Sequence, residues 1–160
     1  MNGNLTHRRR EIQIGLLVLA APMVVVAAWA LVAPHGWFDT FPGGGRHWVS
    51  ALGPYDEHLV RDFGGTYLAL GLLLVFAAYK LDRLLVQAAL GASLVFQVPH
   101  FIFHVANTGP LSTGDNVINL LLLGGGLVLT GILLSMTGSP AALSTRESQS
   151  IERGVTYGTR

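Results

Sequence analysis

The chain has 160 residues, of which 51% are hydrophobic and only 12% are charged, and its formal net charge is +1. Soluble domains usually contain about 25% charged residues, so this composition, with a mean hydropathy of +0.50, excludes an ordinary soluble domain and indicates a membrane protein. The small net charge argues against a nucleic-acid partner held by a basic surface. The sequence has no cysteine, which excludes disulfides, thiolate metal ligands and thiol redox chemistry.

Four apolar segments follow one another along the chain, and their interiors lack Lys, Arg, Asp and Glu. They cover approximately residues 12–33, 55–79, 84–106 and 116–136, the second beginning with polar first turns. Each is close to the ~20 residues that cross a bilayer core as a helix. Helices are expected because a segment in lipid must satisfy its own backbone hydrogen bonds. The sequence therefore predicts an all-α fold, a four-transmembrane-helix bundle over residues 12–136, with the lipid bilayer around it.

The remaining segments are predicted to lie outside the membrane. Residues 1–11 form a short basic N-terminus. Residues 34–53 form the longer connection, with aromatic side chains that suit the membrane interface. Residues 137–160 are polar without a periodic apolar face, which predicts a disordered tail.

The basic residues predict the orientation of the chain. Eight of the ten Lys and Arg lie before the first span, between the second and third, or after the fourth, and the other side has only Arg46 and Arg61. Because cytoplasmic loops carry an excess of Lys and Arg, both termini are predicted to be cytoplasmic, in a bacterial plasma membrane. A cleaved signal peptide is the alternative interpretation of the first segment, although that segment is long and Pro34 would hinder cleavage.

Histidines gather on the predicted external side, which holds five of the six by this topology. His100 and His104 lie four apart in FQVPHFIFHVAN, and therefore on one side of a helix. His58 and Asp62 have the same spacing at the external end of the second span. Because ionisable groups rarely face lipid, the two pairs are expected to face each other. Imidazole and carboxylate suit zinc, iron, copper or nickel, so these four residues are the predicted metal ligands.

Three neighbouring polar residues are expected to support this cluster, namely Arg61, Gln97 and Asn119. A transition metal ion is the cofactor that the residues suit best, and haem held by two histidines is a rarer variant. Two other interpretations stay open. The same residues form a small-molecule or proton pocket in which His58 titrates near neutral pH, or they only fix helix packing at the membrane surface.

The glycines are interpreted as helix-packing positions. Gly64, Gly65, Gly71 and the run at 124–126 lie inside apolar segments that no strand precedes, so a phosphate-binding loop is excluded. Small residues allow two helices in a membrane to approach closely.

The segment HLVRDFGGTYLALGLLLVFAAY resembles the second helix of small four-span bacterial membrane proteins of the DoxX-like group. There an Arg, an acid and a Gly-Gly pair precede a Leu-rich helix, as Arg61, Asp62 and Gly64–Gly65 do here. With PHFIFH, the pattern looks closest to actinobacterial integral membrane proteins without an assigned activity. The resemblance spans about residues 12–136 and is most specific from Arg61 to Gly71. It implies a left-handed four-helix bundle with both ends in the cytoplasm. Some members have quinone-linked or thiol redox partners, and the absence of cysteine argues against carrying over the thiol role.

These observations favour a non-enzymatic integral membrane protein whose external His/Asp cluster binds a metal ion or a small ligand, or docks a redox partner. A membrane enzyme or redox subunit acting on a lipid or quinone is one alternative, with His58 or His100 as its base. A purely structural membrane subunit is the other. A membrane-protein partner or a homo-oligomer is compatible with each of these functions.

Overall fold

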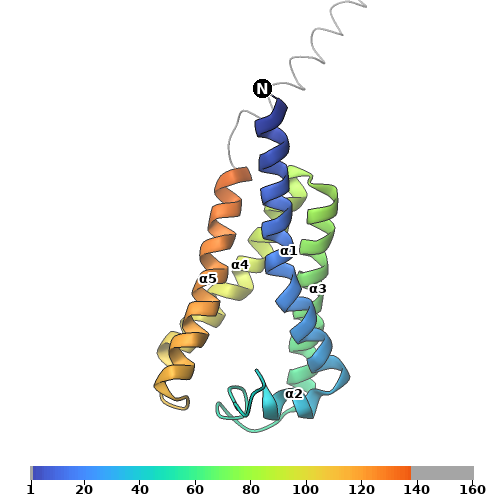
Figure 1. Cartoon of the computed structure of the whole chain (residues 1–160). Helices are drawn as coiled ribbons and strands as arrows, with labels where there is room; N and C mark the ends of the chain where they lie inside the picture. The colour runs from blue at the N-terminus through green and yellow to red at the C-terminus, as the bar shows by residue number, and fades with distance from the viewer. Residues whose placement is uncertain (1, 138–160) are drawn as a thin grey trace, which may run out of the picture.

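The computed structural model describes residues 2–137, with side chains from His7 onward, and Figure 1 shows this part of the chain as five helices without a strand. The helices are α1 (Asn2–Val32), α2 (Pro34–Thr40), α3 (Glu57–Lys80), α4 (Arg83–Ala106) and α5 (Thr113–Thr137). All except α2 are long and apolar enough to cross a membrane. The predicted all-α class with four membrane-spanning helices is therefore confirmed. The predicted disordered tail, from residue 138 onward, lies outside the described residues.

The boundaries of α3 and α4 follow from local capping. The Asp56 carboxylate accepts a hydrogen bond from the Leu59 backbone N–H at 3.2 Å, and Asp82 accepts one from Leu85 N–H at 3.0 Å. Each aspartate satisfies one of the free N–H groups at the start of its helix. Leu81 takes a left-handed conformation, with φ of 49°, and ends α3. The tight connection between α3 and α4 is thus two residues long.

The connection after α1 contains one element that the sequence analysis missed. Residues 34–53 were predicted to be a loop, but α2 occupies Pro34–Thr40. Pro34 stands at the first helical position, where its missing N–H costs nothing. Trp37 and Phe38 from this helix are buried against Ala30 and Val60. Burial of these two rings, rather than a place at the lipid interface, explains the short helix.

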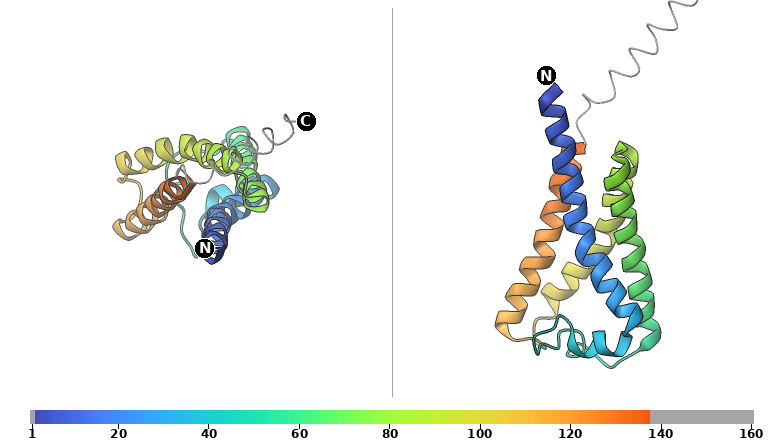
Figure 2. Two further views of the ribbon diagram at one scale, coloured as in Figure 1. Left: turned by 90° about the horizontal axis from the view of Figure 1, so that it is seen from above. Right: turned by 45° about the vertical axis from the view of Figure 1, so that its right-hand side comes forward.

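The long helices form two pairs that diverge. Helix α1 packs along α3, and α4 packs along α5. All four helices contribute to one core toward the end that carries the N-terminus, made of Leu16, Leu19, Ala20, Met23, Leu74, Ala77, Ala78, Val86, Ala89, Leu90 and Leu133. The core at the opposite end contains only Ala30, Trp37, Phe38 and Val60, from α1, α2 and α3. Figures 1 and 2 show the two pairs separating toward that opposite end, so the molecule is V-shaped.

Glycines on α3 allow the close approach of α1. A Cβ atom added to Gly71 would lie 2.9 Å from Val24 Cγ2, and one added to Gly64 would lie 2.9 Å from Leu31 Cγ. A Cβ on Gly65 would meet no atom within 4 Å. The predicted packing role is confirmed for Gly64 and Gly71 and is wrong for Gly65. Since van der Waals packing holds helices together in lipid, this contact fixes the rotation of α3.

Candidate functional site

A buried polar bridge joins α4 and α5 near the wide end of the V. His104 Nδ1 and Asn119 Nδ2 lie 2.9 Å apart, and both side chains are buried. With the amide nitrogen as donor, Nδ1 accepts and the imidazole proton resides on Nε2. Nε2 has no hydrogen-bond partner among the described residues. Asn119 therefore fixes the ring of His104 while one ring nitrogen stays available.

His100 lies one helical turn inward from His104 on the same side of α4. The two imidazoles are 4.8 Å apart between centroids and nearly perpendicular, at 78°. His100 also stacks on the ring of Phe96, with 5.4 Å between the ring centroids. No residue between 7 and 137 makes a hydrogen bond to His100. Among the described residues, His100 is therefore held by ring contacts rather than by a hydrogen bond.

A second polar bridge lies deeper in the same interface. Gln97 Nε2 donates to Thr130 Oγ1 at 3.3 Å, and the Thr130 hydroxyl is also 2.8 Å from the Gly126 carbonyl oxygen. Gln97, His100 and His104 continue the buried stripe of α4, which begins at Val86. The predicted supporting residues Gln97 and Asn119 thus both lie at the α4–α5 interface.

Aromatic rings connect the histidine pair to the other half of the molecule. Trp37 of α2 stacks on Phe63 at 5.0 Å, Phe63 stacks on Tyr67 at 5.1 Å, and Tyr67 contacts Phe96 at 5.1 Å. Phe96 then stacks on His100. The sequence analysis did not predict this row, although Phe63, Tyr67 and Phe96 all lie in spans. Phe63 and Tyr67 on α3 are four residues apart, as are Phe96 and His100 on α4. Each pair therefore shares one side of its helix, and this spacing could have predicted the row.

The second predicted pair lies apart from the first. His58 Nε2 and Asp62 Oδ2 are 3.5 Å apart, with 83% and 63% of their side chains exposed. The buried stripe of α3 runs through Val60, Gly64 and Gly71 toward α1. Residues two positions from Val60 lie about 200° around the helix from it. His58 and Asp62 therefore face away from α1, and the expectation that the two pairs face each other is not met.

Arg61 was expected to support the His/Asp cluster, but its contacts lie elsewhere. Its guanidinium pairs with Glu57, with Nη2 at 2.7 Å from Oε1, and Nη1 donates to the Leu31 carbonyl oxygen at 3.2 Å. Arg61 thus ties the start of α3 to the end of α1. It does not support the histidine pair.

The four predicted metal ligands therefore form two separate pairs. Between residues 7 and 137, no three His, Asp or Glu side chains gather closely enough to hold a metal ion together. Structural zinc sites use four protein ligands and catalytic ones three. The geometry offers two imidazoles, His100 and His104, to any ion that binds here.

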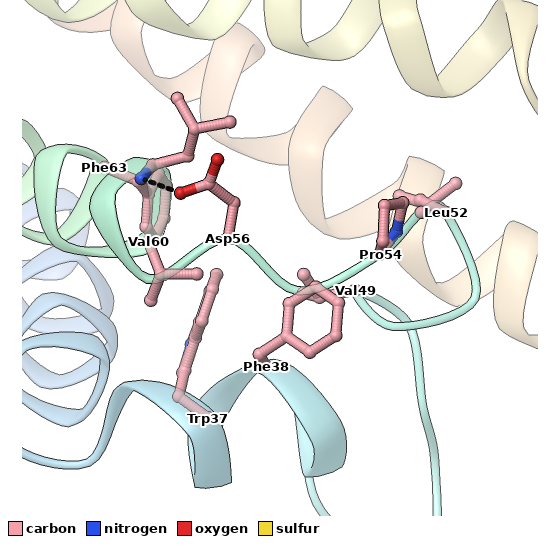
Figure 3. Close-up of a pocket in the computed structure, with 10 residues that line it drawn as sticks. Trp37, Phe38, Val49, Leu52, Pro54, Asp56, Val60 and Phe63 are labelled. Carbon is pink, nitrogen blue, oxygen red and sulfur yellow. Dashed lines mark hydrogen bonds between the residues drawn. The ribbon is translucent and has the colours of Figure 1, made fainter.

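An apolar pocket of about 280 Å³ lies beside α2, on the other side of the V (Figure 3). Its walls come from α2, the following loop and the start of α3, as Trp37, Phe38, Val49, Leu52, Gly53, Pro54, Asp56, Leu59, Val60 and Phe63. Asp56 is the one charged residue in this lining, and Figure 3 shows its carboxylate engaged in the cap of α3. The pocket therefore offers apolar surface and is distinct from the histidine pair.

No protein-family model, curated protein or solved structure matches this chain.

Proposed function

We propose that this integral membrane protein is non-enzymatic and binds a small amphipathic ligand at its His100–His104 pair. The observation that carries the proposal is the unequal state of the two imidazoles. Asn119 holds His104 with Nε2 available, and His100 has ring contacts but no hydrogen bond within residues 7–137. Intramembrane ionisable residues are functional candidates by default.

The surroundings favour a ligand with one polar group on an apolar body. His104 presents an N–H donor, which suits a carbonyl, ester or phosphate oxygen. Phe96 and Tyr67 provide an aromatic wall beside His100. An amide rather than a carboxylate holds His104, and a carboxylate is the group that usually makes a histidine a strong general base. Binding is therefore favoured over catalysis.

A transition metal ion is the second candidate. Two histidines four apart on a helix chelate one ion when both ring nitrogens point to it. With the Asn119 amide reversed, its oxygen would accept from His104 Nδ1–H, which is the usual outer contact of a metal-bound histidine. The remaining ligands would come from water or from a docked redox partner.

The test compares what the purified protein carries. Protein in mild detergent is extracted and analysed by mass spectrometry for organic molecules, and by elemental analysis for metals. We expect one equivalent of an organic molecule on the wild type and on His58→Ala/Asp62→Ala, and its loss from His100→Ala. One equivalent of metal with the same dependence on His100 supports the second candidate. The proposal is contradicted if neither an organic molecule nor a metal is found in any variant, or if His100→Ala retains the bound species. A structural subunit is then the remaining interpretation.

The proposed orientation places the histidine pair outside the cytoplasm. Arg8, Arg9, Arg10, Lys80 and Arg83 lie at the narrow end of the V. The described basic residues elsewhere are Arg46 and Arg61, at the wide end. This asymmetry supports cytoplasmic termini in a bacterial plasma membrane.

Kinship with the DoxX-like group is also a proposal. It is supported by the segment Arg61–Gly71, in which Gly64 and Gly71 are the residues that pack against α1. A redox partner or a second copy of the chain would then have access to the long apolar faces of α4 and α5.

A further inference from the structure

The loop between α2 and α3, residues 41–56, crosses the wide end of the V, and we name it the external strap. Figures 1 and 2 show it passing from α2 toward the start of α5. On the α2 side, the buried Trp48 donates its backbone N–H to the Phe41 carbonyl oxygen at 2.9 Å, and the two rings are in edge contact at 6.2 Å. This end of the strap is firmly attached to the α1–α2–α3 half.

On the other side the strap is attached by an ion pair. Arg46 Nε donates to Asp115 Oδ1 at 2.8 Å, with 46% and 23% of the two side chains exposed. The Ser112 hydroxyl donates to the other carboxylate oxygen at 2.7 Å and accepts from Asp115 N–H at 3.1 Å. The second bond is a helix N-cap, and the first holds the carboxylate that accepts from Arg46. Ser112 is thus the capping residue of α5.

The attachment point is one helical turn from the candidate site. Asp115 and Asn119 are four apart on α5 and lie on one side of the helix. Asp115 holds the strap, and Asn119 holds His104. The strap is therefore attached one helical turn away from the residue that holds His104.

The backbone directly before Arg46 consists of glycines. Gly43, Gly44 and Gly45 directly precede Arg46, and all three have positive φ, at 102°, 64° and 75°. Such conformations are accessible to glycine at little cost, and so is the change between them. Exposed ion pairs are weak, so release of Arg46 from Asp115 costs little.

We propose that the external strap is a lid over the outer entrance to the His100–His104 site, and that the Arg46–Asp115 ion pair is its latch. The proposal rests on the proposed function for the meaning of the site, but access to His100 is measurable without any ligand. Opening the latch leaves both ends of the strap in place and exposes the entrance to the outer aqueous phase.

The absence of cysteine from the sequence makes a direct test available. His100→Cys introduces a single thiol, and its rate of modification by a membrane-impermeant methanethiosulfonate reagent is measured in proteoliposomes. We expect Arg46→Asp to raise this rate about fivefold, the population change expected for an exposed ion pair at its strongest. Asp115→Arg should act likewise, and the Arg46→Asp/Asp115→Arg double variant, which restores the pair, should return the rate to that of the parent.

Two controls keep the result specific. Arg61→Asp removes an arginine at the same end of the molecule that pairs locally with Glu57, and it should leave the rate unchanged. Thr108→Cys, in the exposed loop after α4, should react equally in all backgrounds. An unchanged rate at position 100 in Arg46→Asp, an equal rise in Arg61→Asp or at position 108, or no recovery in the double variant would overturn the lid. Loss of the co-purified molecule from His100→Ala tests the proposed function separately.

Discussion

His104 and Asn119 face each other across the α4–α5 interface, 2.9 Å apart and both buried. Hydrogen bonds between membrane helices are worth about 0.6 kcal/mol on average and at most about 1.7 kcal/mol. In a double-mutant cycle with His104→Ala and Asn119→Ala, we expect a coupling energy of about 1 kcal/mol in the free energy of unfolding. Detergent-based unfolding measures it. Asn107→Ala, which removes an amide bonded locally to the Phe103 carbonyl, should not couple to His104→Ala; a coupling near zero at Asn119 would show that the bridge is not formed.

Replacement of His100 by phenylalanine separates ligand binding from structure. Phenylalanine keeps the ring contacts with Phe96 and His104, and His100 has no hydrogen bond within residues 7–137 to lose. We expect His100→Phe to change the free energy of unfolding by less than about 0.5 kcal/mol while the co-purified molecule is lost. His104→Phe should cost about 1–3 kcal/mol because Asn119 is left unpaired. Equal destabilisation by the two variants would indicate that His100 has a packing role.

Gly71 and Gly65 lie on the same helix, α3, and allow a matched comparison of two alanine variants. An alanine at position 71 would place its Cβ 2.9 Å from Val24 Cγ2 and 3.3 Å from the Val24 backbone nitrogen, and a β-branched side chain on a rigid helix gives way poorly. We expect Gly71→Ala to lower the free energy of unfolding by about 1–3 kcal/mol. Gly65→Ala should leave it unchanged or raise it by up to about 1 kcal/mol, the helix-propensity gain. The same effect at both positions would mean that α3 is rotated differently.

The proposed orientation predicts the activity of alkaline phosphatase fusions, since this enzyme is active only outside the cytoplasm. A fusion at residue 82, in the two-residue connection between α3 and α4, should be inactive, and one at residue 110, in the loop before α5, should be active. A green fluorescent protein series at the same positions should give the opposite pattern. Activity at residue 82 would place the histidine pair in the cytoplasm.

Prediction from sequence identified which polar residues of α4 share one side, but not the helix that this side faces. Gln97, His100 and His104 share one side of a helix, and the structure buries that side against α5. On α3, Gly64 and Gly65 were both interpreted as packing positions, whereas only Gly64 packs against α1. One position corresponds to about 100° of rotation. The heptad spacing of Gly64 and Gly71 was the signal that favoured the correct side.

The sequence by itself determined the number, the approximate ends and the helical state of the spans. Lipid leaves a backbone no other way to satisfy its hydrogen bonds, and about 20 apolar residues are needed to cross it. Only the tertiary structure decided which polar side chains meet. That outcome depends on how each helix is rotated and how far the two pairs diverge, and these follow from close contacts such as that of Gly71 with Val24. Hydropathy is a property of each segment alone, whereas rotation is a property of two surfaces in contact.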